Sequence, residues 1–467
     1  MKKRVETDSI GSMELPEEAY YGVQSLRAFN NFNITGRKMH KLMIISLAEI
    51  KKAAAITNRN SGLLDSKKAN AIIKACDEII NGKFHDQFII DPIQGGAGTS
   101  ANMNANEVIA NRAIELLGGT KGNYAIVHPN DDVNMCQSTN DVFPTAGKMT
   151  ALKLIPNVIS ELQKLYTSLE LKSIEFDDVV KMGRTQLQDA VPMTLGQSFH
   201  SYSSAIKRDI DRLIKVQDEI RIVNMGATAI GTGINTTPYY MDNIVSTLNI
   251  ISKLNLSQAT DLIDGTQNID CFVVVSGILK SSAVNLSKMA NDLRLLSSGP
   301  KTGIAEIILP AKQNGSSIMP GKINPVIPEV VSQVAFNIIG NDATITMAAE
   351  AGQLELNPFE PVLFYNLFES IETLASAINT FEVNCVSGIK ANKERCKELV
   401  ENSVSIVTAL CPYLGYKKSA SIAKESLKTG VLVRNIVLKE GLMSEQKLNE
   451  VLNILTMTQS IRKLKVS

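Results

Sequence analysis

Five long stretches with helical hydrophobic period constrain the fold of this chain more than any other feature of its sequence. They cover about residues 145–173, 195–223, 269–296, 327–350 and 361–385. A helix of ~28 residues is ~40 Å long, and rods of that length bury their apolar stripes best by lying side by side. The sequence therefore predicts a mostly α protein built around a long helical bundle.

The third of these stretches, residues 269–296, carries small or apolar residues on nearly every side. A helix that is apolar all round has to be buried all round, which the bundle of a single chain rarely provides. Packing of one bundle against another in an oligomer explains this composition better than a central place in a monomeric bundle. Both arrangements stay open at this point.

Shorter helical patterns flank the long ones. They cover about residues 38–61, 66–81 and 100–117, whereas the first ~30 residues mix Pro, Gly and polar residues and predict irregular structure. Short helices separated by turns are expected after Ala391. The change from short to long helical patterns and back along the chain predicts three domains. They are an N-terminal domain of residues 1–140, a central helical bundle domain of residues 141–395 and a small helical C-terminal domain of residues 396–467.

Composition argues against several classes of partner. The 48 Lys and Arg residues balance 47 Asp and Glu residues, with no basic stripe of the kind that nucleic-acid binders carry. No run approaches the ~20 apolar residues that span a bilayer, and the first residues lack the apolar stretch of a signal peptide. The six cysteines are scattered, which favours free thiols in a reducing compartment. We expect a cytoplasmic protein that binds neither nucleic acid nor membrane.

The sequence predicts neither a metal site nor a cofactor. Only four histidines occur, and no two of them have the spacing of metal ligands on one helix. Neither a GxGxxG motif nor a Walker motif is present to hold a nucleotide. Ordinary side chains are therefore expected to carry the chemistry.

Four segments are dense in Gly, Ser, Thr and Asn against this helical background: residues 95–104, 128–141, 183–189 and 315–325. Their hydroxyls and amides hydrogen-bond a carboxylate without neutralising it, and Arg184 and Lys322 add charge. A helix start behind such a segment adds free N–H groups, so a small dicarboxylate fits such a site. For each of the first three segments alone, turn and capping chemistry is an equally good interpretation.

The fourth segment, GSSIMPGKINP at residues 315–325, has no capping pattern of its own, and its two glycines suit a mobile lid. It closely resembles GSSxMPxKxNP, the signature of the aspartase/fumarase superfamily. The other three segments match the remaining conserved blocks of that family in the same order, so the resemblance covers essentially the whole chain. It implies a three-domain fold and a homotetramer with a central bundle of about twenty helices.

Within the superfamily, the chain resembles the aspartase branch more than the class II fumarases. The block GRTQLQDAVP at residues 183–192 has the aspartase form, whereas fumarases typically read Thr-His and Asp-Ala-Thr-Pro there. QSTND at residues 137–141 and AEAGQLELN at residues 349–357 are also aspartase-like, whereas residues 128–134 fit both branches. The resemblance implies a carbon–nitrogen lyase that deaminates L-aspartate reversibly to fumarate and ammonia through an enediolate carbanion. A fumarase is the first alternative, and a non-catalytic structural protein on the same fold is the second.

The resemblance also implies a role for each site residue. The substrate carboxylate on which negative charge develops would be bound by Thr99, Ser138, Thr139 and Asn140. These are neutral donors, which can strengthen their hydrogen bonds as the charge grows.

The remaining roles fall on the third and fourth segments. Thr185, Lys322 and Asn324 would hold the other carboxylate, with Lys322 supplying fixed charge as a catalytic residue, and Gln186 would lie near the amino group. Ser316 would be the general base, and Ser317 would offer further substrate contacts. In this family the first two segments come from one subunit, the third from a second subunit and the fourth from a third.

Other polar residues favour plainer interpretations. His128 is a second anion contact or has a surface or capping role, of which the latter is preferred, and His200 is structural. Cys136 lies close to the site in sequence, but no histidine partner marks it as a nucleophile.

Overall fold

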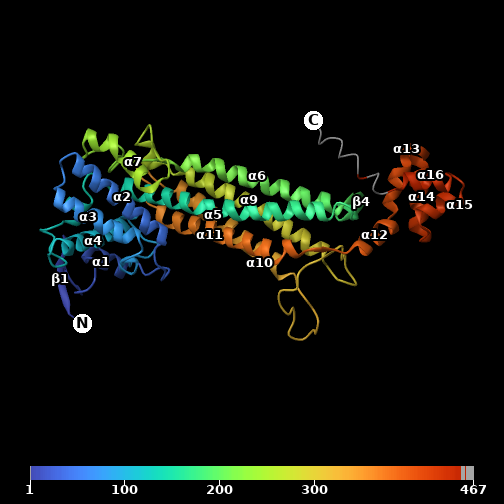
Figure 1. Ribbon diagram of the computed structural model, residues 1–467, viewed down its shortest axis with the longest axis horizontal. Coiled ribbons are helices and arrows are strands. Elements are labelled where there is room, and N and C mark those ends of the chain that lie inside the picture. The colour runs from blue at the N-terminus through green and yellow to red at the C-terminus, as the bar shows by residue number, and fades with distance from the viewer. Residues whose placement is uncertain (1, 454–457, 459–467) are drawn as a thin grey trace. The chain divides into compact units, whose positions relative to one another are not determined.

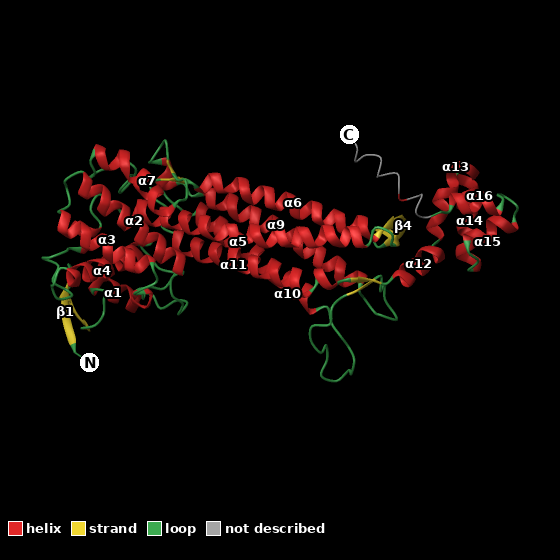
Figure 2. Cartoon of the chain, viewed as in Figure 1, coloured by secondary structure: helices red, strands yellow, loops and turns green. Residues whose placement is uncertain are grey.

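The structure is a computed structural model, which describes residues 2–453 and 458 (Figure 1). Helices dominate the described part of the chain, as the sequence predicts (Figure 2). The five predicted long stretches are confirmed as α5 (Thr139–Glu175), α6 (Leu195–Ile220), α9 (Asp270–Leu296), α10 (Val326–Glu350) and α11 (Glu360–Asn384). The start of α5 lies earlier than expected, within the second polar segment, and the helix runs through Pro144 and Pro156.

The chain forms two compact units, and each of the five long helices contributes residues to both. Unit 1 comprises Met1–Ile159, Asp211–Ser281 and Phe336–Ala375. Unit 2 comprises Ser160–Ile210, Ser282–Ala335 and Ser376–Ser467. The division into three domains at residues 140 and 395 stays a prediction.

Unit 1 opens with a β-hairpin and a helix, so the expectation of irregular structure in the first 30 residues is wrong. Strands β1 (Lys3–Thr7) and β2 (Ser12–Pro16) pair antiparallel, and α1 (Val23–Asn31) follows. The guanidinium of Arg4 donates to the carbonyl oxygens of Pro16 and Ala19 at 2.9 and 2.7 Å. The two strands, KRVET and SMELP, lack the apolar alternation by which strands are usually predicted. The sequence therefore contains no sign of a hairpin that polar contacts hold.

The rest of unit 1 packs shorter helices with parts of the long ones. Its further elements are α2 (Lys41–Asn60), α3 (Ser66–Ile80), α4 (Thr99–Leu116), α7 (Pro238–Ser252), α8 (Asp264–Gln267) and the short parallel pair β5 (Ile222–Val223) and β6 (Ser257–Gln258). An ion pair of 2.6 Å between Lys153 and Glu49 joins α5 to α2. Asp342 on α10 accepts a hydrogen bond of 2.7 Å from Ser276 on α9. The three shorter helical patterns predicted before residue 120 are thus confirmed as α2, α3 and α4.

In unit 2 the third polar segment forms a β-hairpin, although the sequence suggested a loop. Strands β3 (Val180–Thr185) and β4 (Gln188–Thr194) pair antiparallel, with a register shift between Met182 and Arg184. Only Gln186 and Leu187 form the turn, both with positive φ, of 54° and 63°. The many polar residues of this segment lie exposed near the tip, which is why they resemble a loop in the sequence.

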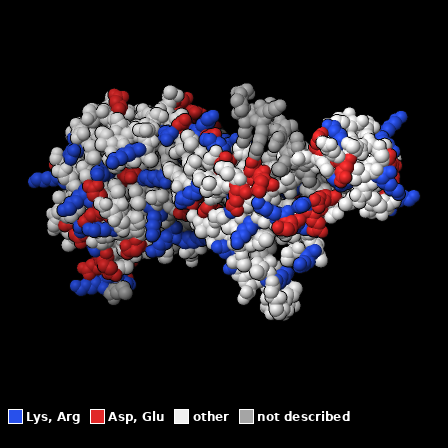
Figure 3. Space-filling model, turned by 45° about the vertical axis from the view of Figure 1, so that its right-hand side comes forward, with Lys and Arg blue, Asp and Glu red and all other residues white. Residues whose placement is uncertain are grey.

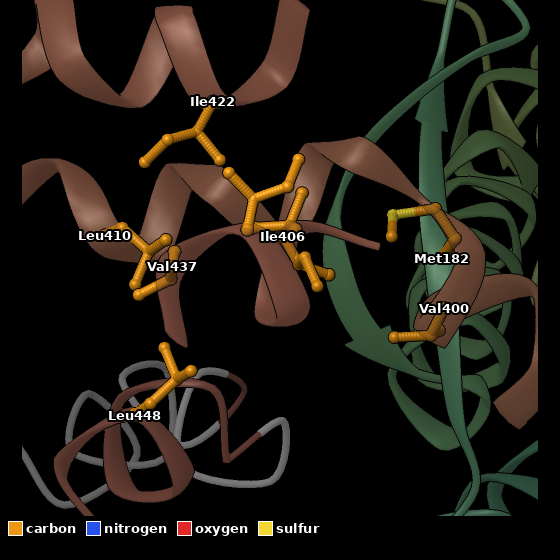
Figure 4. Close-up of a cluster of buried hydrophobic side chains, with 9 residues drawn as sticks. Met182, Val400, Ile406, Leu410, Ile422, Val437 and Leu448 are labelled. Carbon is orange, nitrogen blue, oxygen red and sulfur yellow. The ribbon is translucent and has the colours of Figure 1, made fainter. Parts of the chain in front are cut away.

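Short elements complete unit 2. They are β7 (Ile307–Ile308), β8 (Lys390–Ala391), α12 (Lys393–Asn402), α13 (Cys411–Leu414), α14 (Tyr416–Thr429), α15 (Val433–Lys439) and α16 (Glu445–Val451). Buried side chains from these helices, among them Val400, Ile422 and Leu448, pack in one cluster with Met182 of β3 (Figure 4). The expectation of short helices after Ala391 is therefore confirmed.

Helix α9 is not buried all round within one chain. Val274 and Val284 on this helix are 44% and 49% exposed, and Phe336 and Met347 on α10 are 62% and 71% exposed. Large apolar side chains of this kind on exposed helix faces are typical of surfaces that pack against another molecule.

Basic and acidic side chains are interspersed on the face shown in Figure 3. In the described part of the chain, no helix is both long enough and apolar enough to span a membrane.

Candidate active site

The first polar segment leads into the N-terminus of α4. Thr99 is the first residue of that helix and is exposed, and the backbone N–H groups of Thr99 and Ala101 donate to the carbonyl oxygen of Gly96 and to Gln94 Oε1. Gly98 precedes Thr99 with φ of 85°, and a Cβ at this position would lie 2.4 Å from the ring of Phe143. The segment therefore needs glycine both for its backbone conformation and for its packing.

Asn102 joins the first polar segment to the second. Its side-chain amide donates to Thr139 Oγ1 at 3.1 Å and to Asn134 Oδ1 at 3.2 Å. The structure thus brings the first two predicted segments together in unit 1, as a site that uses both requires. Sequence reasoning did not single out Asn102, since it looks like an ordinary polar residue in an alanine-rich helix.

Ser138 and Thr139 form the start of α5. Ser138 Oγ accepts a hydrogen bond of 3.2 Å from the backbone N–H of Asn140, and Thr139 Oγ1 accepts from Asn102. Because each hydroxyl is already an acceptor within the protein, its own hydrogen stays available to donate to an anion. The positive end of the helix dipole adds to the attraction.

Asn140 is held by a segment that the sequence did not mark. Its side-chain Nδ2 donates to the carbonyl oxygen of Ala229 at 2.7 Å, which leaves one amide hydrogen for another acceptor. A ligand that Asn140 contacts would thus meet a fixed amide group.

A buried lysine lies behind the second segment. Lys51 on α2 donates to Asn134 Oδ1 at 2.7 Å and to Gln137 Oε1 at 2.9 Å. Burial lowers the pKa of Lys51 to about 7, although the carboxylate of Asp141 acts in the opposite direction. In the sequence Lys51 is one of two adjacent lysines, and no motif surrounds it.

The third segment presents Thr185 and Gln186 at the exposed tip of the β3–β4 hairpin. Arg184, whose charge we expected to serve a ligand, instead forms an ion pair of 2.8 Å with Glu306. Glu306 is fully buried, and Lys181 Nζ lies 3.3 Å from its other oxygen. The hairpin is therefore held by a buried carboxylate from the stretch that precedes the fourth segment.

Replacing Glu306 by alanine is expected to lower the free energy of unfolding by about 3–5 kcal/mol, because it leaves the ammonium of Lys181 buried without its partner. Urea unfolding followed by circular dichroism measures this change. The exposed pair Lys3–Glu14 is the control, since Glu14→Ala is expected to cost less than about 1 kcal/mol. Equal costs for the two substitutions would contradict the structural role of Glu306.

The fourth segment closes on itself. The N–H of Gly315 donates to the carbonyl oxygen of Lys322 at 2.8 Å, and Asn324 Nδ2 donates to the carbonyl oxygen of Gly315 at 2.7 Å. A Cβ at Gly315 would lie 2.4 Å from the same oxygen of Lys322, so only glycine permits this closure. Asn324 thus also has a structural role, in addition to the predicted substrate contact.

Two backbone N–H groups of the fourth segment point at the hydroxyl oxygen of Ser316. Its Oγ accepts hydrogen bonds from the backbone N–H groups of Ile318 at 3.2 Å and Met319 at 3.1 Å. Donors that point at an oxygen stabilise its anionic form and so favour loss of the proton. Ser317 and Lys322 on the same segment are exposed.

The plainer interpretations hold for the other polar residues. His128 Nδ1 accepts from the backbone N–H groups of Asn130 and Asp131, which confirms its capping role. His200 pairs with Glu170 at 3.0 Å on the neighbouring helix. Burial raises the pKa of the Cys136 thiol, so this residue lacks the character of a nucleophile.

In the part of the chain that the structure describes, no group of three or more His, Cys, Asp or Glu side chains is arranged to hold a metal ion. Thr99 also lines a cavity of about 620 Å³ in unit 1, together with Arg27, Glu107 and His128. The first and second segments thus belong to unit 1, and the third and fourth belong to unit 2.

Comparison with known protein families assigns this helical fold to a class of lyases. A family model described as "Lyase" matches residues 11–340, and a second, described as "Fumarase C C-terminus", matches residues 406–459. The chain belongs to this lyase family, the aspartase/fumarase superfamily.

Its relatives within the family are more specific. An aspartate ammonia-lyase from Bacillus sp is 52% identical, and the match covers 97% of each chain. The solved structure of a fumarate lyase:delta crystallin from Brucella melitensis has a TM-score of 0.95 at 48% identity, covering 98% of this chain and 99% of that one. A class II fumarase from Schistosoma mansoni has a TM-score of 0.94 at 36% identity, with the same coverage.

Proposed function

We propose that this chain is an aspartate ammonia-lyase, which catalyses the reversible deamination of L-aspartate to fumarate and ammonia. The observation that carries the proposal is the fourth segment, where two backbone N–H groups point at the hydroxyl oxygen of Ser316. Its signature sequence and the full-length similarity to proteins named aspartate ammonia-lyase support deamination of aspartate as the reaction in which that hydroxyl takes part.

The reaction begins with removal of a weakly acidic proton from the carbon next to the side-chain carboxylate. Ser316, as an alkoxide held by the N–H groups of Ile318 and Met319, takes this proton. The electron pair left on carbon spreads onto the carboxylate and gives an enediolate with additional negative charge. The C–N bond then breaks, ammonia leaves, and the double bond of fumarate forms.

Stabilisation of the enediolate falls to the N-termini of α4 and α5. The hydroxyls of Thr99, Ser138 and Thr139 and the amide of Asn140 donate to the oxygens on which the charge develops. Donors that are already fixed, as Ser138 and Thr139 are by their own hydrogen bonds, need no reorganisation as the charge grows.

The other end of the substrate is held by the third and fourth segments. Lys322 supplies a fixed positive charge to the second carboxylate, and Thr185 and Asn324 add hydrogen bonds. Gln186 lies near the ammonium group, where its carbonyl oxygen accepts a hydrogen bond. Ser317 adds a further contact to the substrate.

The same proposal includes assembly into a homotetramer, in which three subunits contribute segments to each site. The exposed apolar residues of α9 and α10, such as Val284 and Phe336, support packing of one bundle against another. The balanced charge of the chain and the scattered cysteines support a cytoplasmic location.

The substrate assignment is tested by following fumarate formation from aspartate, malate and argininosuccinate in separate assays. We expect fumarate from aspartate alone. Fumarate from malate but not from aspartate would mean that the chain is a fumarase. Loss of all three activities in a folded protein would instead favour a structural role.

A further inference from the structure

The carboxylate of Asp141 has no part in the proposed deamination of aspartate, yet it is among the most deeply buried charged groups of unit 1. Asp141 is 0% exposed and lies in the first turn of α5, directly behind Ser138 and Thr139. A carboxylate buried this deeply is tolerated only where hydrogen bonds compensate for its lost hydration.

Three backbone N–H groups supply that compensation, and they come from two separate parts of the chain. Asp141 Oδ1 accepts from Ser138 at 3.0 Å. Asp141 Oδ2 accepts from Gly226 at 3.1 Å and from Thr228 at 3.0 Å. Burial raises the pKa of Asp141 to about 6 in spite of these contacts.

Residues 224–229, which we call the strap, make two further contacts with the same turn. Asn224 Nδ2 donates to the carbonyl oxygen of Asn140 at 3.0 Å. Asn140 Nδ2 donates in return to the carbonyl oxygen of Ala229 at 2.7 Å. Both ends of the strap are therefore bonded to Asn140, and its middle is bonded to Asp141, which in turn holds the backbone N–H of Ser138.

The backbone of the strap is strained where it meets Asp141. Gly226 has φ of 96°, and Thr228, a β-branched residue, has φ of 56°. A β-branched residue in this region is unfavourable by about 1–3 kcal/mol and persists only where surrounding contacts over-determine it. Here the N–H groups that this conformation directs at Asp141 offset that cost.

We propose that Asp141 is a positioning residue for the substrate: its carboxylate clamps the Ser138–Asn140 turn to the strap. The clamp fixes the hydroxyls of Ser138 and Thr139 in the orientation that binds the charge-accumulating carboxylate. This inference rests on the proposed function of these hydroxyls. Displacement of such donors by about 1 Å is enough to cost about 100-fold in rate.

The test is Asp141→Asn, which keeps the size of the side chain but replaces one acceptor oxygen by an NH₂ group. That group would face a backbone N–H, so at least one side of the clamp opens. We expect the kcat/KM for aspartate to fall, and the inhibition constant of succinate, a dicarboxylate that does not react, to rise, each by at least about tenfold. Amide hydrogen exchange should become faster in the peptides that cover residues 134–141 and 222–230.

Asp91 offers a matched control. It is 5% exposed, lies in the same unit, and accepts backbone N–H groups from Thr35 at 2.7 Å, Gly36 at 3.0 Å and Ile93 at 2.9 Å. Asp91→Asn should lower the thermal midpoint about as much as Asp141→Asn does, while both constants stay within about twofold of the wild type. If Asp141 had a purely structural role, the two constants would change equally in Asp141→Asn and Asp91→Asn.

Asn224→Ala is a milder second variant, which loses the strap's hydrogen bond to Asn140 and should raise the inhibition constant of succinate about fivefold. An inhibition constant that stays within about twofold of the wild type in Asp141→Asn would overturn the inference. Wild-type protein that forms no fumarate from aspartate would refute the proposed function instead. In that case amide hydrogen exchange still tests whether Asp141 fixes the turn to the strap, since unchanged exchange at residues 134–141 in Asp141→Asn would refute the clamp.

Discussion

Replacing Ser316 by alanine is expected to reduce turnover of aspartate by about 10⁴-fold, with fold and assembly intact. The substitution removes the only oxygen at which the N–H groups of Ile318 and Met319 stabilise a negative charge. The segment is also closed through Gly315, Lys322 and Asn324, so it is expected to keep its conformation when the two hydrogen bonds to the hydroxyl are lost. Fumarate formation, the thermal midpoint and the mass of the assembled particle would be measured on the same preparation.

Ser444 provides the control for this substitution. Its hydroxyl caps the N-terminus of α16 by accepting a hydrogen bond of 3.3 Å from the backbone N–H of Lys447. Ser444→Ala should cost about 1 kcal/mol of stability and leave turnover unchanged. Near wild-type activity in Ser316→Ala would assign the base to another residue.

Lys322→Met should raise the KM for aspartate by about 100-fold, because the variant leaves one substrate carboxylate without its charged partner. The turnover number should change less, since this carboxylate carries the same charge in the ground state and in the transition state. Steady-state kinetics over a wide range of aspartate concentrations separates the two effects.

Lys312 lies shortly before the fourth segment, and its side chain is also exposed. Lys312→Met removes a charge of the same sign from nearly the same part of the chain, so it controls for general electrostatic attraction. We expect its KM to stay within about twofold of the wild type. The same increase in both variants would mean that Lys322 acts only through the overall field of the protein.

The helices were predictable because their hydrophobic period repeats over many residues, and a long repeat outweighs local ambiguity. The two hairpins were not. Contacts of Arg4 with distant carbonyl groups hold β1 and β2, and Glu306, far along the chain, holds β3 through Arg184. Polar contacts of this kind join residues more than ten positions apart and leave no periodic signal in the sequence.

Some residues of the candidate site could likewise be predicted from the sequence, and others could not. Ser316 and Lys322 stand in a motif whose residues are adjacent in the sequence, so the motif alone identifies them. Lys51, Asn102 and Glu306 contribute through partners that only the fold brings near. Asp141 had a local signal, since Ser138 and Asp141 have the spacing of a reciprocal helix cap, but the second half of its role depends on the strap.

We propose that segments from different copies of the chain form each site. Refolding two inactive variants together in equal amounts, Ser316→Ala and the double variant Ser138→Ala/Thr139→Val, tests this arrangement. If each site takes its second segment from one subunit and its fourth from another, random assembly restores about a quarter of the wild-type activity. If one chain forms the whole site, every site carries a defect and the mixture stays inactive, which would contradict the account.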